Sequence, residues 1–420
     1  MGQGLIYTSY YLGNPEDRKI NALGGVCLMG GGTENDSATK WFLQRANGGD
    51  ILVLRTSGAD GYNEYFWNLK YKLGISINSI ETIVFHERRA SYEPYIHKKI
   101  QQAEAIWIAG GNQATYVEYW RNTPIDSLIN EAIQKRNIAI GGTSAGMAIL
   151  GEYYFSACKG TIRSEEALKD PFHPNLCVEK QRFLLTPLLQ GIITDTHYDN
   201  PDRKGRHIVF LAKLLKEHGI EAKGIACDEH TAVCISPEGI ARVFGEYPQE
   251  EDYAYFIQVN CENTLKEPEI YEPQKPLEWN HNNTALIAYQ IAGTPEGKTF
   301  FDLSNWRVAE GGEWQYWSVI GGEMIIRASR APNCPTTSIK SQSFPLISVK
   351  GRELIFIQHT CRLKQVLLIN SLGQFFLEKT PYTNTHVLET SIDIPGFYFL
   401  VIQDEAGAVF FKKFYLPVKE

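Results

Sequence analysis

The sequence predicts an α/β fold in which a mostly parallel sheet is flanked by helices. A β-rich extension and a C-terminal immunoglobulin-like β-sandwich are expected to follow. Short, continuous apolar runs alternate with helical segments over roughly the first 240 residues, as in parallel sheets covered on both faces. The composition then shifts to Pro, Glu, Asn and Tyr with little helical period. Closely spaced apolar runs separated by turn residues end the chain, which is typical of a small sandwich.

Length and charge exclude several classes of protein. The 420 residues suggest two or three domains, with 43% hydrophobic and 21% charged residues as in ordinary globular chains. The net charge is −7 and no Lys/Arg block stands out, so no nucleic-acid partner is expected. No apolar stretch is long enough for a membrane helix. A homodimer is compatible with this composition.

The eight cysteines form no Cys-x-x-Cys pair, so neither a zinc site nor a redox motif is expected. Their even number permits disulfides, but isolated buried thiols are the expected state for most of them. The first residues, Met1 to Leu5, lack the charged and then apolar pattern of a signal peptide.

The first predicted domain comprises residues 1–245. Its predicted strands are residues 24–30, 50–56, 80–85, 105–109 and 138–140, and its predicted helices are residues 39–46, 62–73, 92–103, 114–120 and 125–135. Residues 246–330 form the expected β-rich extension, packed on the first domain. A linker is expected at residues 331–345. The sandwich domain, residues 340–420, has predicted strands at 354–358, 365–370, 374–378, 385–390, 396–403 and 409–416.

The strongest chemical motif is Gly142-Thr143-Ser144-Ala145-Gly146, which follows the apolar run Ile138–Ile140. A serine on a sharp turn between a strand and a helix has its hydroxyl lifted away from the backbone, and small neighbours permit close substrate approach. The N–H of Ala145 is suited to face a developing oxyanion. The alternative is a structural glycine-rich turn, which is about as common for an isolated motif of this kind.

His197 is the expected base for Ser144, because it lies just beyond the apolar run Leu188–Ile193. Residues beyond the carboxyl ends of parallel strands line the crevice of an open sheet. Asp228 or Glu229, at the end of another short strand, would orient the imidazole. The chain order of serine, histidine and acid differs from the order in α/β-hydrolases, which argues against a lipase or esterase of that fold.

A further strand ends in Gly110-Gly111-Asn112-Gln113. Gly110 or Gly111 would supply a second oxyanion N–H, and Gln113 would bind a carboxylate or amide of the substrate. The alternative for this segment is a tight turn between a strand and a helix.

Four stretches in this order resemble the cyanophycinase and peptidase E family of serine peptidases. They are Gly110-Gly111-Asn112-Gln113, Gly142-Thr143-Ser144-Ala145-Gly146, Asp195-Thr196-His197-Tyr198 and Asp228-Glu229-His230-Thr231-Ala232, and Gly30-Gly31-Gly32 with Glu34 matches the opening loop of the family. The resemblance covers about residues 20–245. It implies a fold like that of class I glutamine amidotransferases, with serine in place of their cysteine.

The same resemblance implies hydrolysis next to aspartyl residues without a metal or organic cofactor. It assigns Ser144 as nucleophile, His197 as base, Glu229 as its partner, and Gly111 and Ala145 as oxyanion donors. The residues expected to bind the substrate are Asn112, Gln113, Asp195, Arg203 and Arg206. The family has glutamine at position 196 and arginine at position 201, where this chain has Thr196 and Pro201. The prediction therefore extends to the chemistry, on a peptide or aspartate-rich polypeptide, rather than to cyanophycin.

The C-terminal region resembles the sorting domain of the type IX secretion system. The resemblance is carried by residues 366–374, by Ile394-Pro395-Gly396-Phe397-Tyr398 and by the basic ending around Lys412-Lys413. It implies contact with the secretion machinery and a secreted or cell-surface location. An ordinary immunoglobulin-like accessory module is the alternative.

Three functions remain in competition on these residues. The first is an active secreted serine peptidase or isopeptidase, and the second is a non-catalytic surface-binding protein that retains the hydrolase fold. The third, an amidotransferase-like or deglycase-like activity, requires cysteine where the chain has Ser144 and ranks last.

Overall fold

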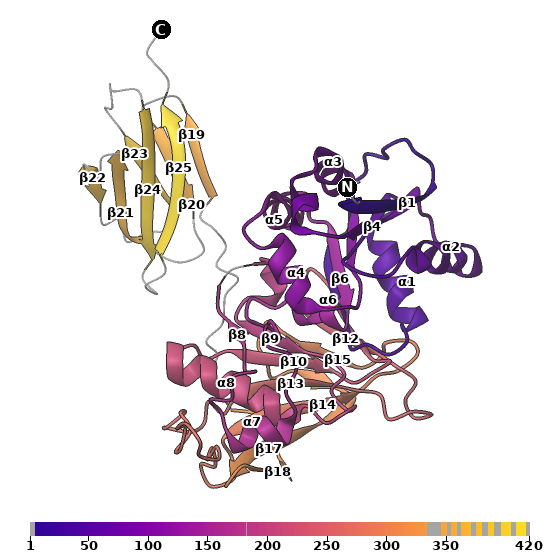
Figure 1. Ribbon diagram of the computed structural model, residues 1–420. Helices are drawn as coiled ribbons and strands as arrows, with labels where there is room; N and C mark the ends of the chain where they lie inside the picture. Colours follow the sequence, from indigo (N-terminus) through magenta and orange to yellow (C-terminus); the bar gives the residue numbers. More distant parts are fainter. Residues whose placement is uncertain are drawn as a thin grey trace. The chain divides into compact units, whose positions relative to one another are not determined.

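The computed structural model divides the chain into two compact units, Met1–Pro335 and Thr336–Glu420 (Figure 1). In the first unit the structure describes residues 5–181 and 183–333. In the second unit it describes residues 346–350, 354–358, 363–370, 375–379, 385–389, 396–404 and 409–416. Most of the predicted linker at residues 331–345 lies outside the described residues.

The largest sheet of the first unit has a parallel centre, as predicted. Its adjacent parallel strands are β4 (Ser79–Phe85), β3 (Asp50–Arg55), β5 (Ala105–Ile108), β6 (Ala139–Thr143) and β2 (Gly25–Met29). Antiparallel strands extend both edges: β1 (Tyr7–Gly13) beside β4, and β11 (Ala232–Ile235), β12 (Ile240–Phe244), β15 (Phe300–Asp302) and β16 (Ala309–Glu310) beyond β2. The central strands are buried along nearly their whole length, which explains their continuous apolar sequences.

Helices cover both faces of this parallel centre. Its helices are α1 (Asp36–Arg45), α2 (Gly61–Leu73), α3 (Pro94–Gln102), α4 (Gln113–Trp120) and α5 (Pro124–Arg136). Along β3, Ile51 and Val53 pack in one core with residues of α1 and α2, whereas Leu52 and Leu54 pack in another with residues of α3, α4 and α5. This alternation follows from the two-residue period of a strand.

The second sheet differs from the sequence-based expectation. Its order is β18 (Glu323–Ala328), β17 (Gly312–Ile320), β14 (Leu286–Ala292), β13 (Tyr253–Val259), β10 (Lys223–Cys227) and β9 (Ile192–Asp195). The strands β9 and β10 were expected in one sheet with the others, but they pair in parallel here and are continued by the extension. Residues 246–330 therefore complete this sheet and add β15 and β16 to the first. Helices α7 (Ser164–Lys169) and α8 (Lys204–His218) contribute to the core on one of its faces.

The C-terminal unit contains two antiparallel sheets. The three-stranded sheet is β19 (Leu346–Lys350), β20 (Leu354–Gln358) and β23 (Thr385–Glu389); the four-stranded sheet is β22 (Phe375–Lys379), β21 (Leu363–Asn370), β24 (Gly396–Asp404) and β25 (Val409–Leu416). All six predicted strands lie close to these bounds. Alternate residues of β21 and β24 are buried, namely Val366, Leu368, Leu400 and Ile402, so one face of this sheet is covered. Its classification as immunoglobulin-like stays a prediction.

The cysteines only partly match the expectation of isolated thiols. Cys27, Cys227 and Cys234 are free and buried, as expected. Cys158 and Cys177, however, form a disulfide, and Cys261 is also disulfide-bonded. A search of the described helices finds none that is both long and apolar enough to cross a membrane.

Candidate active site

Ser144 occupies the sharp turn between β6 and the short helix α6 (Ala145–Ala148). Its φ is 52° and its ψ is −117°, a backbone conformation that is strained for a residue other than glycine. Close packing maintains the turn, because a Cβ on Gly146 would lie 2.0 Å from the carbonyl oxygen of Ile108. The strand-to-helix turn predicted from the sequence is therefore confirmed as geometry, with the serine at its apex.

The structure brings His197 and Glu229 to Ser144. Nε2 of His197 lies 2.7 Å from Oγ of Ser144, and Nδ1 of the same ring is hydrogen-bonded to Oε1 of Glu229. Because a carboxylate only accepts, Nδ1 carries the proton, and Nε2 is left to accept from the serine hydroxyl. Of the two acids that the sequence left open, Glu229 faces the imidazole. Asp228 instead accepts the N–H of Tyr253.

Two neighbouring polar residues hold Glu229 in place. The Nδ2 amide of Asn200 donates to Oε2 of Glu229 at 3.2 Å, and Oδ1 of Asp199 accepts the Glu229 N–H at 2.8 Å. Burial would raise the pKa of Glu229, but hydrogen bonds from His197 and Asn200 hold it below its usual value. Sequence reasoning missed both supports, because two polar residues in a turn form no recognisable motif.

The end of β2 joins the nucleophile to its base. The carbonyl of Met29 accepts the Ser144 N–H at 3.0 Å, and the carbonyl of Gly30 accepts the His197 N–H at 2.8 Å. Gly31 lies against the imidazole, since a Cβ there would be 2.4 Å from Cε1 of His197. The sequence placed these glycines in a family motif, and the structure gives their physical role: only a bare backbone fits beside the ring.

The two expected oxyanion donors are Ala145, directly after Ser144, and Gly111, in the turn after β5. Ala145 is the first residue of α6, so its N–H has no acceptor within the helix. The turn after β5 also approaches the serine, because a Cβ on Gly110 would lie 3.6 Å from Cβ of Ser144. Gly111 follows in this turn, where an added Cβ would meet the hydroxyl of Tyr116 at 3.1 Å.

Asp195 and Arg206 are not available to a substrate, contrary to the prediction. Both side chains are 2% exposed and form a two-pronged ion pair in which Nε of Arg206 lies 2.8 Å from Oδ2 of Asp195. Burial would raise the pKa of Asp195, but the charge of Arg206 keeps it low. Sequence spacing predicts two charged side chains near the base, but it does not show that they form an ion pair with each other.

Arg203 keeps the properties expected of a substrate-binding group. It is half-buried and donates to the carbonyl of Thr196 at 2.9 Å, and in the described part of the chain no carboxylate lies within ion-pair distance. Burial and then the charge of Arg206 lower its pKa to about 10. A desolvated cation without a carboxylate partner favours an anionic ligand.

The two amides after Gly111 have partners within the protein. Oδ1 of Asn112 accepts the N–H of Ala114 and caps α4. Nε2 of Gln113 donates to the carbonyl of Phe155 at 3.2 Å, which occupies the nitrogen end of this amide. A search of the described residues finds no group of three or more His, Cys, Asp or Glu side chains suited to hold a metal ion.

The sharp serine turn, the imidazole and the carboxylate on an α/β sheet have the geometry of a serine hydrolase. The chain belongs to the Peptidase family S51, whose family model matches residues 26–243. This membership confirms the resemblance seen in the sequence and supports a serine-type peptidase. It says nothing about the C-terminal unit, so the sorting domain stays a prediction.

The curated relatives include several cyanophycinases. The cyanophycinase of Synechococcus elongatus is 22% identical over 234 residues, which are 53% of this chain and 67% of that protein. The cyanophycinase of Geminocystis herdmanii (strain PCC 6308) is 24% identical over 231 residues, 52% of this chain and 77% of that protein.

Two solved structures each match a little over half of the chain. A peptidase from an acI-B1 Actinobacterium is 15% identical, with a TM-score of 0.39, and the match covers 56% of this chain and 91% of that one. A putative peptidase E from Listeria monocytogenes EGD-e is 16% identical, with a TM-score of 0.33, and the match covers 54% and 100%.

Proposed function

We propose that this protein is a secreted serine peptidase or isopeptidase that cleaves an aspartyl or β-aspartyl peptide bond through an acyl-enzyme. One observation carries the proposal: Nε2 of His197 lies 2.7 Å from Oγ of Ser144 while its Nδ1 is bound to Glu229. A hydroxyl, an imidazole and a carboxylate in continuous hydrogen-bond contact support the roles of nucleophile, base and orienting group for these three residues.

Each step of the proposed reaction uses a group described above. Oγ of Ser144 attacks the scissile carbonyl carbon and passes its proton to Nε2 of His197, while Glu229 stabilises the imidazolium. The N–H groups of Gly111 and Ala145 stabilise the oxyanion. Nε2 then returns the proton to the leaving amine, which leaves an acyl-Ser144 ester. A water molecule then gives a proton to the same nitrogen and attacks the ester, and Nε2 returns this proton to Oγ of Ser144 as the C–O bond breaks and the acid is released.

Arg203 supports the proposed preference for aspartyl substrates. A carboxylate beside the scissile bond would pair with its guanidinium and compensate a cation that is now desolvated. Pro201 removes one arginine expected from the family pattern, and Arg206 is occupied by Asp195. Of the arginine positions expected from the family pattern, Arg203 therefore remains to bind one carboxylate, which favours a short aspartyl peptide over a repetitive polymer as substrate.

Two features support export to the cell surface or beyond. The disulfide between Cys158 and Cys177 is typical of an oxidising compartment. The separate C-terminal unit, with the strands expected for a sorting domain, would present the enzyme to a secretion machinery.

Labelling with a fluorophosphonate probe tests the nucleophile. We expect the protein to be labelled stoichiometrically and Ser144→Ala to lose all labelling while keeping its unfolding temperature. Absence of labelling in the unmodified protein would favour the alternative of a binding protein that retains the hydrolase fold.

Hydrolysis of matched dipeptides tests the substrate class. α- and β-aspartyl dipeptides and their asparaginyl counterparts should differ at least tenfold in kcat/KM in favour of aspartate, about the effect of one charge-assisted hydrogen bond. Arg203→Gln should remove most of this difference and Arg203→Lys should retain part of it. Equal rates on aspartyl and asparaginyl substrates would contradict the role of Arg203 but leave Ser144 as nucleophile.

A further inference from the structure

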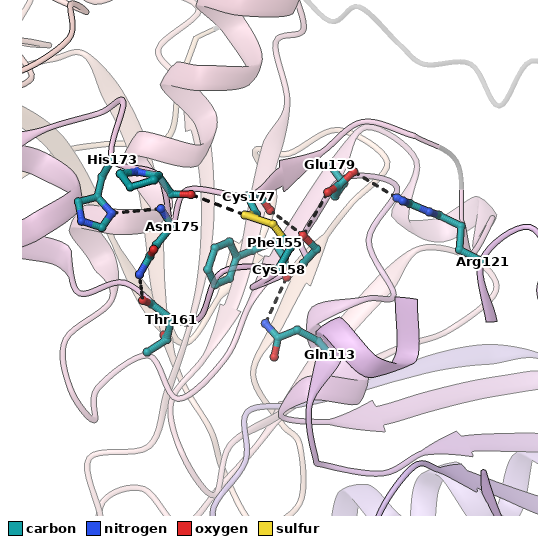
Figure 2. Close-up of a disulfide and its surroundings, with 11 residues drawn as sticks. Gln113, Arg121, Phe155, Cys158, Thr161, His173, Asn175, Cys177 and Glu179 are labelled. Atoms are coloured by element: carbon teal, nitrogen blue, oxygen red, sulfur yellow. Dashed lines mark hydrogen bonds and ion pairs between the residues drawn. A yellow bond between two sulfur atoms is a disulfide. The ribbon is translucent and has the colours of Figure 1, made fainter. Parts of the chain in front are cut away.

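A disulfide between Cys158 and Cys177 closes residues 158–177 into a loop (Figure 2). We call this loop the 158–177 segment. Its base is the two-stranded pairing of β7 (Tyr154–Phe155) with β8 (Val178–Glu179), and the Ser156 N–H donates to the carbonyl of Cys177 at 2.9 Å. The proposed reaction has no direct use for the disulfide, so its position relative to the site is informative.

The 158–177 segment binds the buried guanidinium of Arg206. Nη1 of Arg206 donates to Oγ1 of Thr161 at 3.1 Å and to the carbonyl of Ile162 at 3.2 Å. Near the closed end, Nδ2 of Asn175 donates to the carbonyl of Thr161 at 3.0 Å (Figure 2). The disulfide thus anchors the side of the segment that supplies these acceptors.

Arg206 in turn fixes the end of β9. Its Nε and Nη2 bind the two carboxylate oxygens of Asp195, the last residue of that strand. Oδ1 of Asp195 also accepts the N–H of Thr196 at 2.9 Å. His197 is the next residue, so the peptide that carries the imidazole is attached to the segment through three consecutive polar contacts.

The same region contacts the opposite side of the site. The carbonyl of Phe155, at the base of the segment, accepts from Gln113, which begins α4 directly after the Gly110–Gly111 turn (Figure 2). The Phe155 ring also lies 5.2 Å from Cζ of Arg206. Phe155, at the base of the segment, therefore contacts both Arg206 and the first residue of α4.

We propose that the disulfide-closed 158–177 segment positions His197 by holding Arg206 against Asp195, so that Arg206 and Thr161 are positioning residues for catalysis and not substrate ligands. This inference rests on the proposed function, because it requires His197 to be the catalytic base. Misplacement of a reacting group by about 1 Å can lower a rate on the order of 100-fold. Contacts that hold His197 in position can therefore change the rate without touching the substrate.

Removing Arg206 would not test this idea. An unpaired buried Asp195 would destabilise the fold by several kcal/mol, and loss of activity would then be trivial. The test therefore uses Cys158→Ser/Cys177→Ser, which opens the segment, and Thr161→Val, which removes one acceptor at nearly constant volume. Thr161→Ser keeps the hydroxyl and serves as the conservative rescue. Lys169→Gln is a matched control, since it breaks only the exposed Lys169–Glu165 pair on the same segment.

The measurement is the fluorophosphonate labelling rate per labelled site, as a function of pH, in the full chain. Counting only sites that finally react removes any contribution from unfolded molecules. We expect the double cysteine variant to react at least tenfold more slowly, with a shifted pH midpoint of labelling. Thr161→Val should react several-fold more slowly, and Thr161→Ser and Lys169→Gln should react at the original rate.

Two outcomes distinguish this inference from the proposed function. If the unmodified protein is not labelled, the proposed function fails and the inference fails with it. If the protein is labelled but the cysteine variant reacts at the original rate and pH midpoint, with only a lower unfolding temperature, the disulfide is purely stabilising. That result would overturn the inference alone.

Discussion

Arg206 and His207 are adjacent, buried residues of α8 that differ in their charge. The guanidinium of Arg206 pairs with the carboxylate of Asp195. His207 is fully buried beside the ring of Tyr198. Burial lowers the pKa of His207 to about 4, with Asp195 opposing and Arg206 assisting the shift. A paired cation and a neutral imidazole therefore lie side by side in one core.

We expect His207 to make stability depend on pH. The unfolded state binds a proton below about pH 6.5, whereas the folded state binds it only below about pH 4, so the free energy of unfolding falls as the pH falls between these values. The loss should be on the order of 3 kcal/mol. Urea unfolding of the wild type and of His207→Phe at pH 7 and pH 4 measures it. An equal loss in both proteins would contradict this assignment.

Individual site residues were predictable where a motif encodes a backbone shape. The glycine and alanine neighbours of Ser144 already indicate a sharp turn, and the structure shows that turn. The direction of the Arg206 side chain was not predictable from spacing near the base. Every residue of α8 from 205 to 212 is buried, so Arg206 is enclosed although no helical period marks its position.

Among the elements, the loop after β2 has the strictest steric requirement. It accepts hydrogen bonds from Ser144 and His197 and leaves no room for a side chain at Gly31, whose φ of 115° also favours glycine. The loop therefore fixes the distance between nucleophile and base from the backbone alone.

Gly31→Ala should displace the imidazole. We expect the labelling rate to fall by a factor on the order of 100, because the added methyl group would overlap the His197 ring. Gly61→Ala is a matched control, because a Cβ at Gly61 has no neighbour within 4 Å. Circular dichroism verifies that both variants fold. Normal labelling of Gly31→Ala would contradict this prediction, because it would show that the loop moves to accommodate the added methyl group.

Existence of most strands was predictable, but their assignment to sheets was not. Continuous apolar runs identify β3, β4 and β5 as strands buried on both faces. The runs of β9 and β10 look the same, although their neighbours lie in another sheet. A continuous apolar sequence indicates that both faces of a strand are buried. It does not indicate which other strand forms hydrogen bonds with its edge.

In the molecule as a whole, every residue of the candidate site lies in the first unit, Met1–Pro335. That unit contains the extension, whose strand β13 pairs along β10 just before Glu229. The catalytic region predicted from the sequence, residues 1–245, is therefore incomplete as a folding unit.

Truncation tests this division. A chain ending at Pro335 should fold and react with the probe at the full rate, since no strand of its sheets is lost. A chain ending at residue 245 should be insoluble, because the apolar strand β10 would lose its partner β13. Size-exclusion chromatography followed by labelling measures both outcomes. Activity in the shorter chain would contradict the structural role of the extension.

The proposed nucleophile and its proposed base follow strands of different sheets: Ser144 follows β6 in the first, and His197 follows β9 in the second. A folding intermediate with either sheet alone would hold only half of the reactive pair. During refolding, the onset of probe labelling should therefore mark the moment when the sheets dock, later than any signal from secondary structure. We therefore expect a newly made molecule to be unreactive toward the probe until its two sheets have packed together.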